Sequence, residues 1–293
     1  MLTPKATAAA VFGLSKNKMI ILKLRGGVGN QMFQYAFGKS LAIRRDEKLI
    51  LDLSDYGLSN RTFSLDSINI KYDFKLENHL ISKLLHKIFR SKIFVDTSPE
   101  GSQSILENLK GKILISGYWE SPKFFKDIEN IIKKEFTLKR VSGHFKKKSE
   151  QIQKDSISIH VRRGDYLIPH GKYLNGIEYY DSAVKKILKI KNVINPQITT
   201  FSDDKDWCRK KMSVLCGIKT EIFDDPEIDD VEELILMSQY NHNVISNSTF
   251  SWWSAYLNKN PDKIIIAPKN WFTDPKQNKK QIEHIMLKSW ILL

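Results

Sequence analysis

Ser156-Ile-Ser-Ile-His-Val161 has the alternating apolar pattern of a strand, and Arg162-Arg-Gly-Asp165 follows it directly. A stretch with helical periodicity comes next, from about Glu178 to Ile190. The same succession of strand and helix continues toward the C-terminus. Strands that alternate with helices of roughly 10–15 residues predict βαβ units and a parallel sheet.

Similar strand and helix patterns occur in the first half of the chain. The predicted helices cover residues 31–45, 78–90, 178–190, 231–240 and 250–257, with a short helix through Trp207. The predicted strands are Met19–Leu24, Lys48–Leu53, Lys112–Ser116, Ser156–Val161, Gln197–Phe201, Lys219–Phe223, Asn243–Ser246 and Lys263–Ala267.

The polar, basic stretch at residues 139–154 is the predicted linker between two domains. We therefore expect an N-terminal domain at 19–150 and a C-terminal domain at 151–293. Residues 1–18 are expected to be a flexible leader, because the first strand begins at Met19. No internal repeat interrupts this organisation.

The chain of 293 residues is basic, with 47 Lys and Arg against 33 Asp and Glu. A net charge of +14 favours anionic partners, which include nucleic acids, phosphorylated small molecules and anionic membrane surfaces. No apolar run reaches the roughly 18–20 residues that a membrane span needs. Two cysteines give no disulfide framework. We therefore expect a cytoplasmic protein, with peripheral contact at the inner membrane compatible with its charge.

A glycine-rich turn, Arg25-Gly-Gly-Val-Gly-Asn-Gln31, follows the first strand and opens a helix. Glycines let a backbone approach a ligand closely, and a helix N-terminus favours anions or polar sugar groups. A dinucleotide-binding fingerprint would need glycine where Met32 stands, although Asp52 has the position of a ribose-binding acid. A phosphate-binding P-loop would need Gly-Lys-Ser/Thr, which is missing. The alternative interpretation is a plain strand-to-helix turn that binds no ligand.

The basic motif after the strand at 156–161 places two arginines where open α/β sheets bind ligands. Strand alternation puts His160 and Arg162 on one face and Val161 and Arg163 on the other. Guanidinium groups bind phosphate oxygens bidentately and stay charged at any working pH. The motif therefore predicts a diphosphate site that needs no metal. A structural Arg–Asp pair is the alternative.

A serine-rich turn, Ser246-Asn-Ser-Thr-Phe-Ser-Trp-Trp-Ser254, has the same strand, turn and helix pattern. Its hydroxyl groups suit a helix N-cap, and the free N–H groups of a helix start bind phosphate. Plain capping is the alternative, and the aromatic residues are expected to pack in the core.

Together, Gly26–Gly38, His160–Tyr166 and Asn247–Trp253 resemble the bacterial α1,2-fucosyltransferases of glycosyltransferase family 11. The resemblance runs from about Met19 to Trp271. It implies an α/β, GT-B-like fold with two Rossmann-like domains facing across a cleft, the N-terminal one on the acceptor side. It further implies inverting transfer of L-fucose from GDP-β-L-fucose to the 2-hydroxyl of a galactoside, without a metal or other cofactor.

The resemblance also suggests which residues act. Asn30 would reach the reacting sugar, and Asp165 is the first candidate for the general base, with Glu178 as the second. The expected catalytic residues are Arg162, Asp165 and Asn30, and the expected GDP-fucose-binding residues are His160, Arg162, Arg163, Asp203, Asp204, Asn247, Ser248, Thr249, Phe250 and Ser251.

Other functions fit part of the pattern. A fucosyltransferase of another linkage, such as α1,6, shares the HxRRxD motif. A nucleic-acid-binding protein would explain the charge, but the lysines are dispersed and the aromatic residues cluster at helix starts. A dinucleotide-dependent oxidoreductase is the third alternative. The expected partners are GDP-fucose and a galactose-terminated oligosaccharide or lipid-linked glycan, with no nucleic acid.

Overall fold

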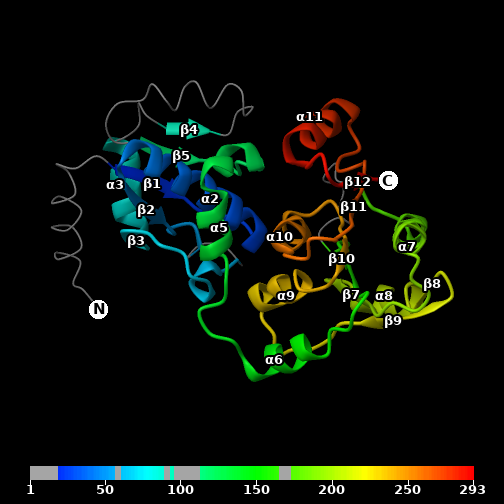
Figure 1. Cartoon of the computed structure of the whole chain (residues 1–293). Coiled ribbons are helices and arrows are strands. Elements are labelled where there is room, and N and C mark those ends of the chain that lie inside the picture. The colour runs from blue at the N-terminus through cyan, green and yellow to red at the C-terminus, as the bar shows by residue number, and fades with distance from the viewer. Residues whose placement is uncertain (1–18, 57–60, 89–92, 96–112, 165–172) are drawn as a thin grey trace. The chain divides into compact units, whose positions relative to one another are not determined.

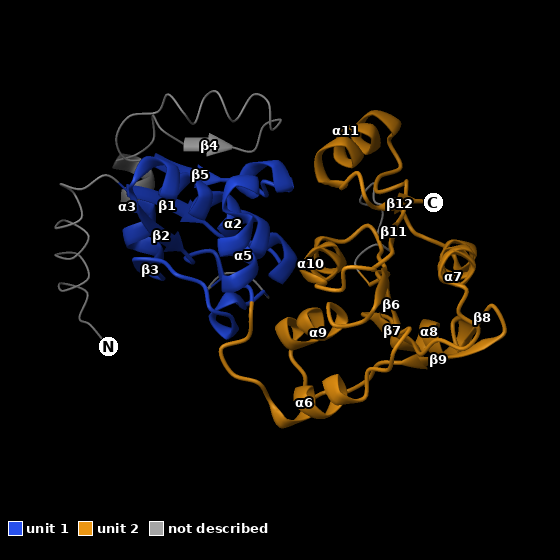
Figure 2. Ribbon diagram, in the orientation of Figure 1, with its two compact units in different colours: residues 1–136 blue, residues 137–293 orange. Residues whose placement is uncertain are grey.

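The chain forms two compact units, residues 1–136 and 137–293, which Figure 2 distinguishes by colour. The structure is a computed structural model that describes residues 19–56, 61–88, 93–95, 113–164 and 173–293 (Figure 1). Each unit is built on its own sheet with helices packed against it. This is the α/β organisation that the succession of strands and helices predicts.

The sheet of the first unit has the order β3-β2-β1-β5-β4, and every neighbouring pair is parallel. Its strands are β1 (Met19–Lys23), β2 (Lys48–Asp52), β3 (Phe74–Leu76), β4 (Ile93–Val95) and β5 (Ile113–Ser116). Its helices are α2 (Val28–Arg45), α3 (His79–Ile88) and α5 (Glu129–Glu135), with 3-10 helices η3 (Leu65–Ser67) and η5 (Pro122–Ile128).

The sheet of the second unit has the order β12-β11-β10-β6-β7-β9-β8, parallel except for the pair β8–β9. Its strands are β6 (Ile157–Val161), β7 (Ile198–Ser202), β8 (Val214–Leu215), β9 (Ile218–Ile222), β10 (His242–Val244), β11 (Ile265–Ala267) and β12 (Ile291–Leu292). Its helices are α6 (Gly143–Glu150), α7 (Ile177–Lys191), α8 (Lys205–Lys211), α9 (Asp230–Met237), α10 (Thr249–Leu257) and α11 (Pro275–Ile285).

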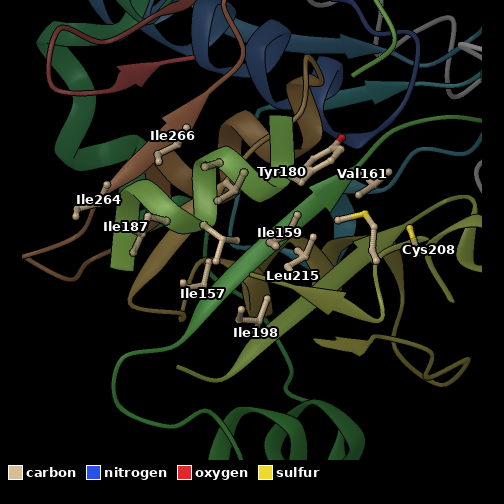
Figure 3. Packing of buried hydrophobic residues seen from close by; sticks show 14 residues of the cluster. Ile157, Ile159, Val161, Tyr180, Ile187, Ile198, Cys208, Leu215, Ile264 and Ile266 are labelled. Carbon is tan, nitrogen blue, oxygen red and sulfur yellow. The ribbon is translucent and has the colours of Figure 1, made fainter. Parts of the chain in front are cut away.

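Strand β6 separates two different environments. Its apolar side chains at 157, 159 and 161 are fully buried with Tyr180 and Ile187 of α7 (Figure 3). The alternate residues face the other helices: Ser158 Oγ contacts the Met237 carbonyl of α9, and the His160 ring stacks on Phe250 of α10. The period of two along β6 therefore sends Val161 and His160 to opposite faces, as predicted.

All the predicted strands form, and four strands of two or three residues are found only in the structure: β3, β4, β8 and β12. Such strands are too short to show a period, whereas β10 and β11, also three residues long, overlap the longer strands predicted at 243–246 and 263–267.

The segment predicted as a linker contains α6. Ser142 Oγ caps this helix by accepting from Phe145 N at 3.0 Å, and Ser142 N donates to Glu232 Oε1 of α9 at 3.0 Å. Phe145 is buried in the second unit. Residues from Thr137 onward therefore belong to that unit.

Helix α2 packs closely on β1 because of Gly38, the last glycine of the first motif. A Cβ at this position would lie 2.7 Å from Leu22 Cδ2 and 3.3 Å from Leu49 Cδ1, and both leucines are buried. Real Cβ atoms do not approach carbon atoms so closely, so a side chain here would push the helix from the sheet.

We expect Gly38→Val to lower the free energy of unfolding by about 2 kcal/mol through overpacking of this contact. Urea denaturation of the variant and the parent protein measures the change. Gly143→Ala, at a glycine whose added Cβ meets nothing within 4 Å, is the control and should be nearly neutral. Equal stability of Gly38→Val and the parent would show that α2 is not held at this distance.

Candidate active site

The carboxyl end of β6 is the point where the chain reverses direction across the second sheet. From β6 the chain proceeds to β7 and β9 on one side, and later returns to β10 on the other side of β6. Ligands of open α/β sheets bind outside the strand ends at such a switch point. The segments that follow β6, β7 and β10 contain nearly all the site residues predicted for this unit.

The turn after β6 is held by Asp203, which follows β7. Asp203 Oδ1 accepts a hydrogen bond from Arg163 N at 2.9 Å, and Oδ2 accepts one from Gly164 N at 3.2 Å. Arg162 Nη1 lies 3.0 Å from the same Oδ2. A Cβ at position 164 would be 2.7 Å from Asp203 Oδ2, so only glycine permits this approach. One carboxylate thus fixes both the backbone of the turn and the guanidinium group of Arg162.

Arg163 has a different set of partners on the other side of the turn. Its Nε lies 3.1 Å from Asp204 Oδ2, and its guanidinium carbon is 4.1 Å from the centre of the Trp207 ring. Asp204 Oδ1 also caps α8 by accepting from Trp207 N at 3.1 Å. Both arginines thus pair with a carboxylate, and the Arg163 side chain is 14% exposed whereas the Arg162 side chain is 23% exposed.

His160 is buried, with 4% of its surface exposed. Its Nδ1 is in hydrogen-bond contact with Ser246 Oγ at 2.8 Å, and its ring stacks on Phe250 with centroids 5.2 Å apart. Burial, and secondarily the charge of Arg162, lowers the pKa of His160 to about 3. The imidazole is therefore neutral at physiological pH and adds no charge to the site.

The serine turn does not behave as a plain helix cap. Ser248 is the N-cap residue of α10, yet its side chain makes no capping hydrogen bond. By contrast, Asp229 Oδ1 caps α9 by accepting from Val231 N at 2.9 Å and Glu232 N at 2.8 Å. The start of α10 thus lacks the side-chain cap that α9 has, and a helix start without one suits an anion.

Two other residues of the serine turn make hydrogen bonds within the protein. Ser251 is fully buried, and its Oγ donates to the Ser248 carbonyl at 3.2 Å. Asn247 Nδ2 donates to the carbonyls of Tyr173 at 2.7 Å and Trp271 at 3.0 Å. These contacts hold the turn and its neighbouring loops in place.

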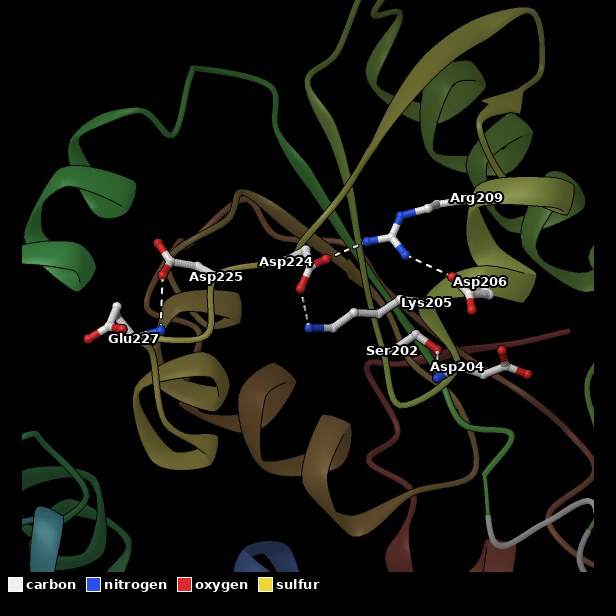
Figure 4. A network of polar contacts seen from close by, with 8 residues as sticks. All are labelled: Ser202, Asp204, Lys205, Asp206, Arg209, Asp224, Asp225 and Glu227. Carbon is white, nitrogen blue, oxygen red and sulfur yellow. Dashed lines mark hydrogen bonds and ion pairs between the residues drawn. The ribbon is translucent and has the colours of Figure 1, made fainter.

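Asp224 and Asp225, which follow β9, each lie beside a basic side chain. Figure 4 shows Asp224 between Lys205 and Arg209, and Asp225 Oδ2 lies 3.2 Å from His144 Nδ1. In the described ranges, no three His, Cys, Asp or Glu side chains are grouped as a metal site would require.

Glu233 on α9 belongs to the surroundings of the site but was not among the predicted residues. Burial, and secondarily the nearby charges of Asp230 and Asp203, raises the pKa of Glu233 to about 7, and Lys205 opposes the rise. Its position in the acidic start of the helix before the serine turn was visible in the sequence. Its burial was not.

The remaining predicted residues lie elsewhere. Asn30 is in the first turn of α2, in the first unit. Glu178 is exposed in the first turn of α7. Asp165 lies outside the described residues.

Two glutamines of the first motif are structural. Gln34 is buried and pairs with the backbone of Arg25 through its Oε1 at 2.9 Å and its Nε2 at 3.0 Å. Gln31 Nε2 donates to the carbonyls of Gly26 at 3.0 Å and Thr62 at 2.8 Å. Side chains of α2 thus hold the backbone of the glycine turn.

The two units, each with helices on a mainly parallel sheet, have the architecture of a GT-B-type fold. The sequence profile described as "Glycosyl transferase family 11" matches residues 2–293, a longer range than the three motifs indicated. The chain belongs to glycosyl transferase family 11.

Curated relatives agree with this family. An alpha-1,2-colitosyltransferase of Escherichia coli is 31% identical over 89% of this chain and 94% of its own. The O-antigen biosynthesis glycosyltransferase WbnK of Escherichia coli is 29% identical over 92% and 99%. The galactoside 2-alpha-L-fucosyltransferase Sec1 of Mus musculus is 23% identical over 89% and 69%.

Solved structures agree on the fold. FUT1 of Arabidopsis thaliana in complex with GDP superposes with a TM-score of 0.53 at 12% identity, over 91% of this chain and 74% of its own. NodZ alpha-1,6-fucosyltransferase soaked with GDP-fucose superposes with a TM-score of 0.51 at 12% identity, over 82% of this chain and 92% of its own. Throughout the part of the chain that the structure describes, no helix has the length and apolar character of a membrane span.

Glu233 gives a pH-dependent prediction. A carboxyl whose pKa is higher in the folded state than in the unfolded state destabilises the protein increasingly as the pH rises from about 4.5 to about 7. Glu233→Gln removes this effect, so the variant should be more stable than the parent at pH 8, by at most about 3 kcal/mol. The advantage should be largely lost at pH 4.5.

Urea denaturation of both proteins at pH 4.5 and pH 8 measures this change. Glu283→Gln on the exposed surface of α11 is the control, and should change stability little at either pH. A stability difference for Glu233→Gln that is the same at both pH values would contradict the raised pKa.

Proposed function

We propose that this enzyme transfers L-fucose from GDP-β-L-fucose to the 2-hydroxyl of a galactoside and forms an α1,2 linkage with inversion. The observation that carries the proposal is Arg162, held by Asp203 at the switch point where β6 and β10 end. The α1,2 linkage is supported by the names of two relatives, the colitosyltransferase and the galactoside fucosyltransferase.

In this reaction the acceptor oxygen forms a bond to C1 of fucose while the bond from C1 to the β-phosphate oxygen breaks. The sugar passes through an oxocarbenium-like state, as in glycoside hydrolysis. GDP leaves as an anion and gains negative charge in the transition state. Fixed positive charge directed at that oxygen therefore lowers the barrier.

Arg162 is the proposed source of this charge, together with the N-terminus of α10. A guanidinium group binds two phosphate oxygens at once and cannot lose its proton at working pH. The nearby carboxylates of Asp203 and Asp204 are each paired with an arginine, which supports a site that neutralises the diphosphate with arginine and helix dipole and not with a metal.

The donor's guanosine is proposed to lie near His160 and Phe250. Their rings are stacked, and the neutral imidazole forms an apolar, aromatic surface beside the charged arginine. Ser248 and Thr249, at the start of α10, are proposed to contact the diphosphate. Asn247 and Ser251 are proposed to act indirectly, because their hydrogen bonds hold this turn.

A general base takes the proton of the acceptor hydroxyl. Asp165 is the first proposed candidate because it directly follows the arginine turn. Glu178 is the second, since it is exposed in the first turn of α7, the helix that follows β6. Asn30 of the first unit is proposed to contact the reacting sugar.

Colitose is the second candidate for the donor sugar, because the colitosyltransferase is 31% identical over 94% of its length. Colitose is L-fucose without the 3-hydroxyl, so both sugars have the same L-series ring and differ only at that position. The acceptor is proposed to be a galactose-terminated oligosaccharide or lipid-linked glycan. For the latter, the net charge of +14 would favour a cytoplasmic enzyme that contacts an anionic membrane surface.

A transfer assay tests the proposed function. We expect GDP-fucose and lactose to give a trisaccharide whose new linkage, by methylation analysis or NMR, is α1,2, and we expect the rate to persist in excess EDTA. GDP-colitose in the same assay identifies the preferred donor. An α1,6 product would refute the linkage, and loss of activity in EDTA that Mn²⁺ or Mg²⁺ restores would refute the metal-free mechanism.

Arg162→Ala should lower kcat by about 100- to 1,000-fold, because the leaving diphosphate loses its fixed positive charge. The initial rate of transfer at saturating substrates measures the loss, and circular dichroism confirms the fold. Arg209→Ala removes an equal charge from exposed α8 and should keep the rate within about twofold. A folded Arg162→Ala enzyme with a near-normal rate would disprove the central role of this residue.

A further inference from the structure

The first unit has a switch point of its own. Strand β1 lies between β2 and β5: the chain proceeds from β1 to β2 and β3 on one side, and β5 returns to the other side. The segments after β1 and β5 therefore meet at one edge of this sheet. They contain Arg25 and Tyr118.

Arg25 is rigidly placed but incompletely bonded. Its backbone N–H and carbonyl both pair with the side chain of Gln34. Its Nε is buried, and among the residues that the structure describes nothing accepts a hydrogen bond from this atom. Buried polar atoms of native proteins nearly always have a partner, and exceptions call for an explanation such as a missing ligand.

Tyr118 lies directly against this guanidinium group. The Arg25 guanidinium carbon is 4.8 Å from the centre of the Tyr118 ring, and 39% of Tyr118 is exposed. The next residue, Trp119, is 1% exposed and stacks on Phe37 of α2 with centroids 4.0 Å apart. One residue of this turn thus anchors it in the core, while its neighbour keeps an aromatic surface open.

The turn adopts an unfavourable backbone conformation to achieve this arrangement. Trp119 has a φ of 56°, in the left-handed region that a bulky residue rarely occupies. Such conformations persist where the surrounding structure imposes them, and they concentrate at ligand-binding sites. Trp119 stacks on Phe37 and packs edge-on against Phe124, and these contacts help to hold it here.

We infer that Arg25 and Tyr118 form a subsite for the acceptor sugar, an inference that rests on the proposed function. A β-galactoside presents one ring face made of C–H groups and an edge of neighbouring hydroxyls. The exposed Tyr118 ring stacks against the C–H face, and the Arg25 fork donates hydrogen bonds to the hydroxyl oxygens. Pockets for small ligands combine an aromatic surface with a few fixed polar groups in this way.

Steady-state kinetics with lactose as the varied acceptor tests the subsite. Arg25→Met and Tyr118→Ala should each raise the KM for lactose by about tenfold or more, because each loses one class of contact. The KM for the GDP-sugar, and the slow hydrolysis of that donor without acceptor, should stay within about twofold. Arg25→Lys keeps the charge but loses the fork, and should remain impaired.

A matched control is available at the opposite edge of the same sheet. Tyr72 precedes β3 and has Lys75 Nζ 5.9 Å from its ring centre, so Tyr72→Ala removes a comparable cation–aromatic contact. This variant should leave the KM for lactose unchanged. Folded Arg25→Met and Tyr118→Ala enzymes with an unchanged KM for lactose, or with an equal rise in the KM for the donor, would overturn the subsite.

Binding without donor separates this inference from the proposed function. Saturation-transfer NMR should detect methyl β-D-galactopyranoside on the parent protein and on Tyr72→Ala, and lose the signal on Arg25→Met and Tyr118→Ala. That pattern without any transfer activity would support the subsite and refute the proposed reaction. Transfer with no loss of galactoside binding in the two variants would support the reaction and refute the subsite.

Discussion

The carboxylate of Asp203 is the contact on which the candidate active site depends. It follows β7, yet it binds the backbone of the turn after β6 at two N–H groups and fixes the guanidinium group of Arg162. Parallel strands make this possible, because their carboxyl ends meet at one edge of the sheet. The arginine is therefore positioned before any ligand binds, and preorganised charge is what stabilises a departing anion.

Apart from its ion pair with Asp203, Arg162 has a neutral neighbour in its own motif. His160, two residues before it, is buried and neutral, so the second potential cation of the motif does not repel the first. Glu233 stands in an environment that raises its pKa to about 7, so its carboxyl group is partly protonated at neutral pH. The guanidinium group of Arg163 pairs with Asp204 and lies over the Trp207 ring. The two adjacent arginines thus have different partners.

In the first unit, uncharged side chains hold the turn that follows the first strand. Buried amides of Gln31 and Gln34 hold the glycine turn after β1, where carboxylates hold the corresponding turn of the second unit. Among the described residues no carboxylate pairs with Arg25, and a neutral sugar is a suitable partner for this arginine and the Tyr118 ring beside it. In the second unit, the ion pair with Asp203 fixes the position of the Arg162 guanidinium group.

The sequence by itself determined the α/β class, the main strands, the family and the arginine motif, because strand period, turn glycines and motif spacing are local properties. It predicted that His160 and Val161 face opposite sides of β6, which the packing confirms.

The sequence did not reveal that the segment at 139–154 contains α6, since that helix is stabilised by contacts with α9 far along the chain. It also left open whether the arginines pair with carboxylates. Only the tertiary structure decided this point, because strand order brings Asp203 and Asp204 to the turn after β6, and strand order is set by long-range packing that no local pattern records.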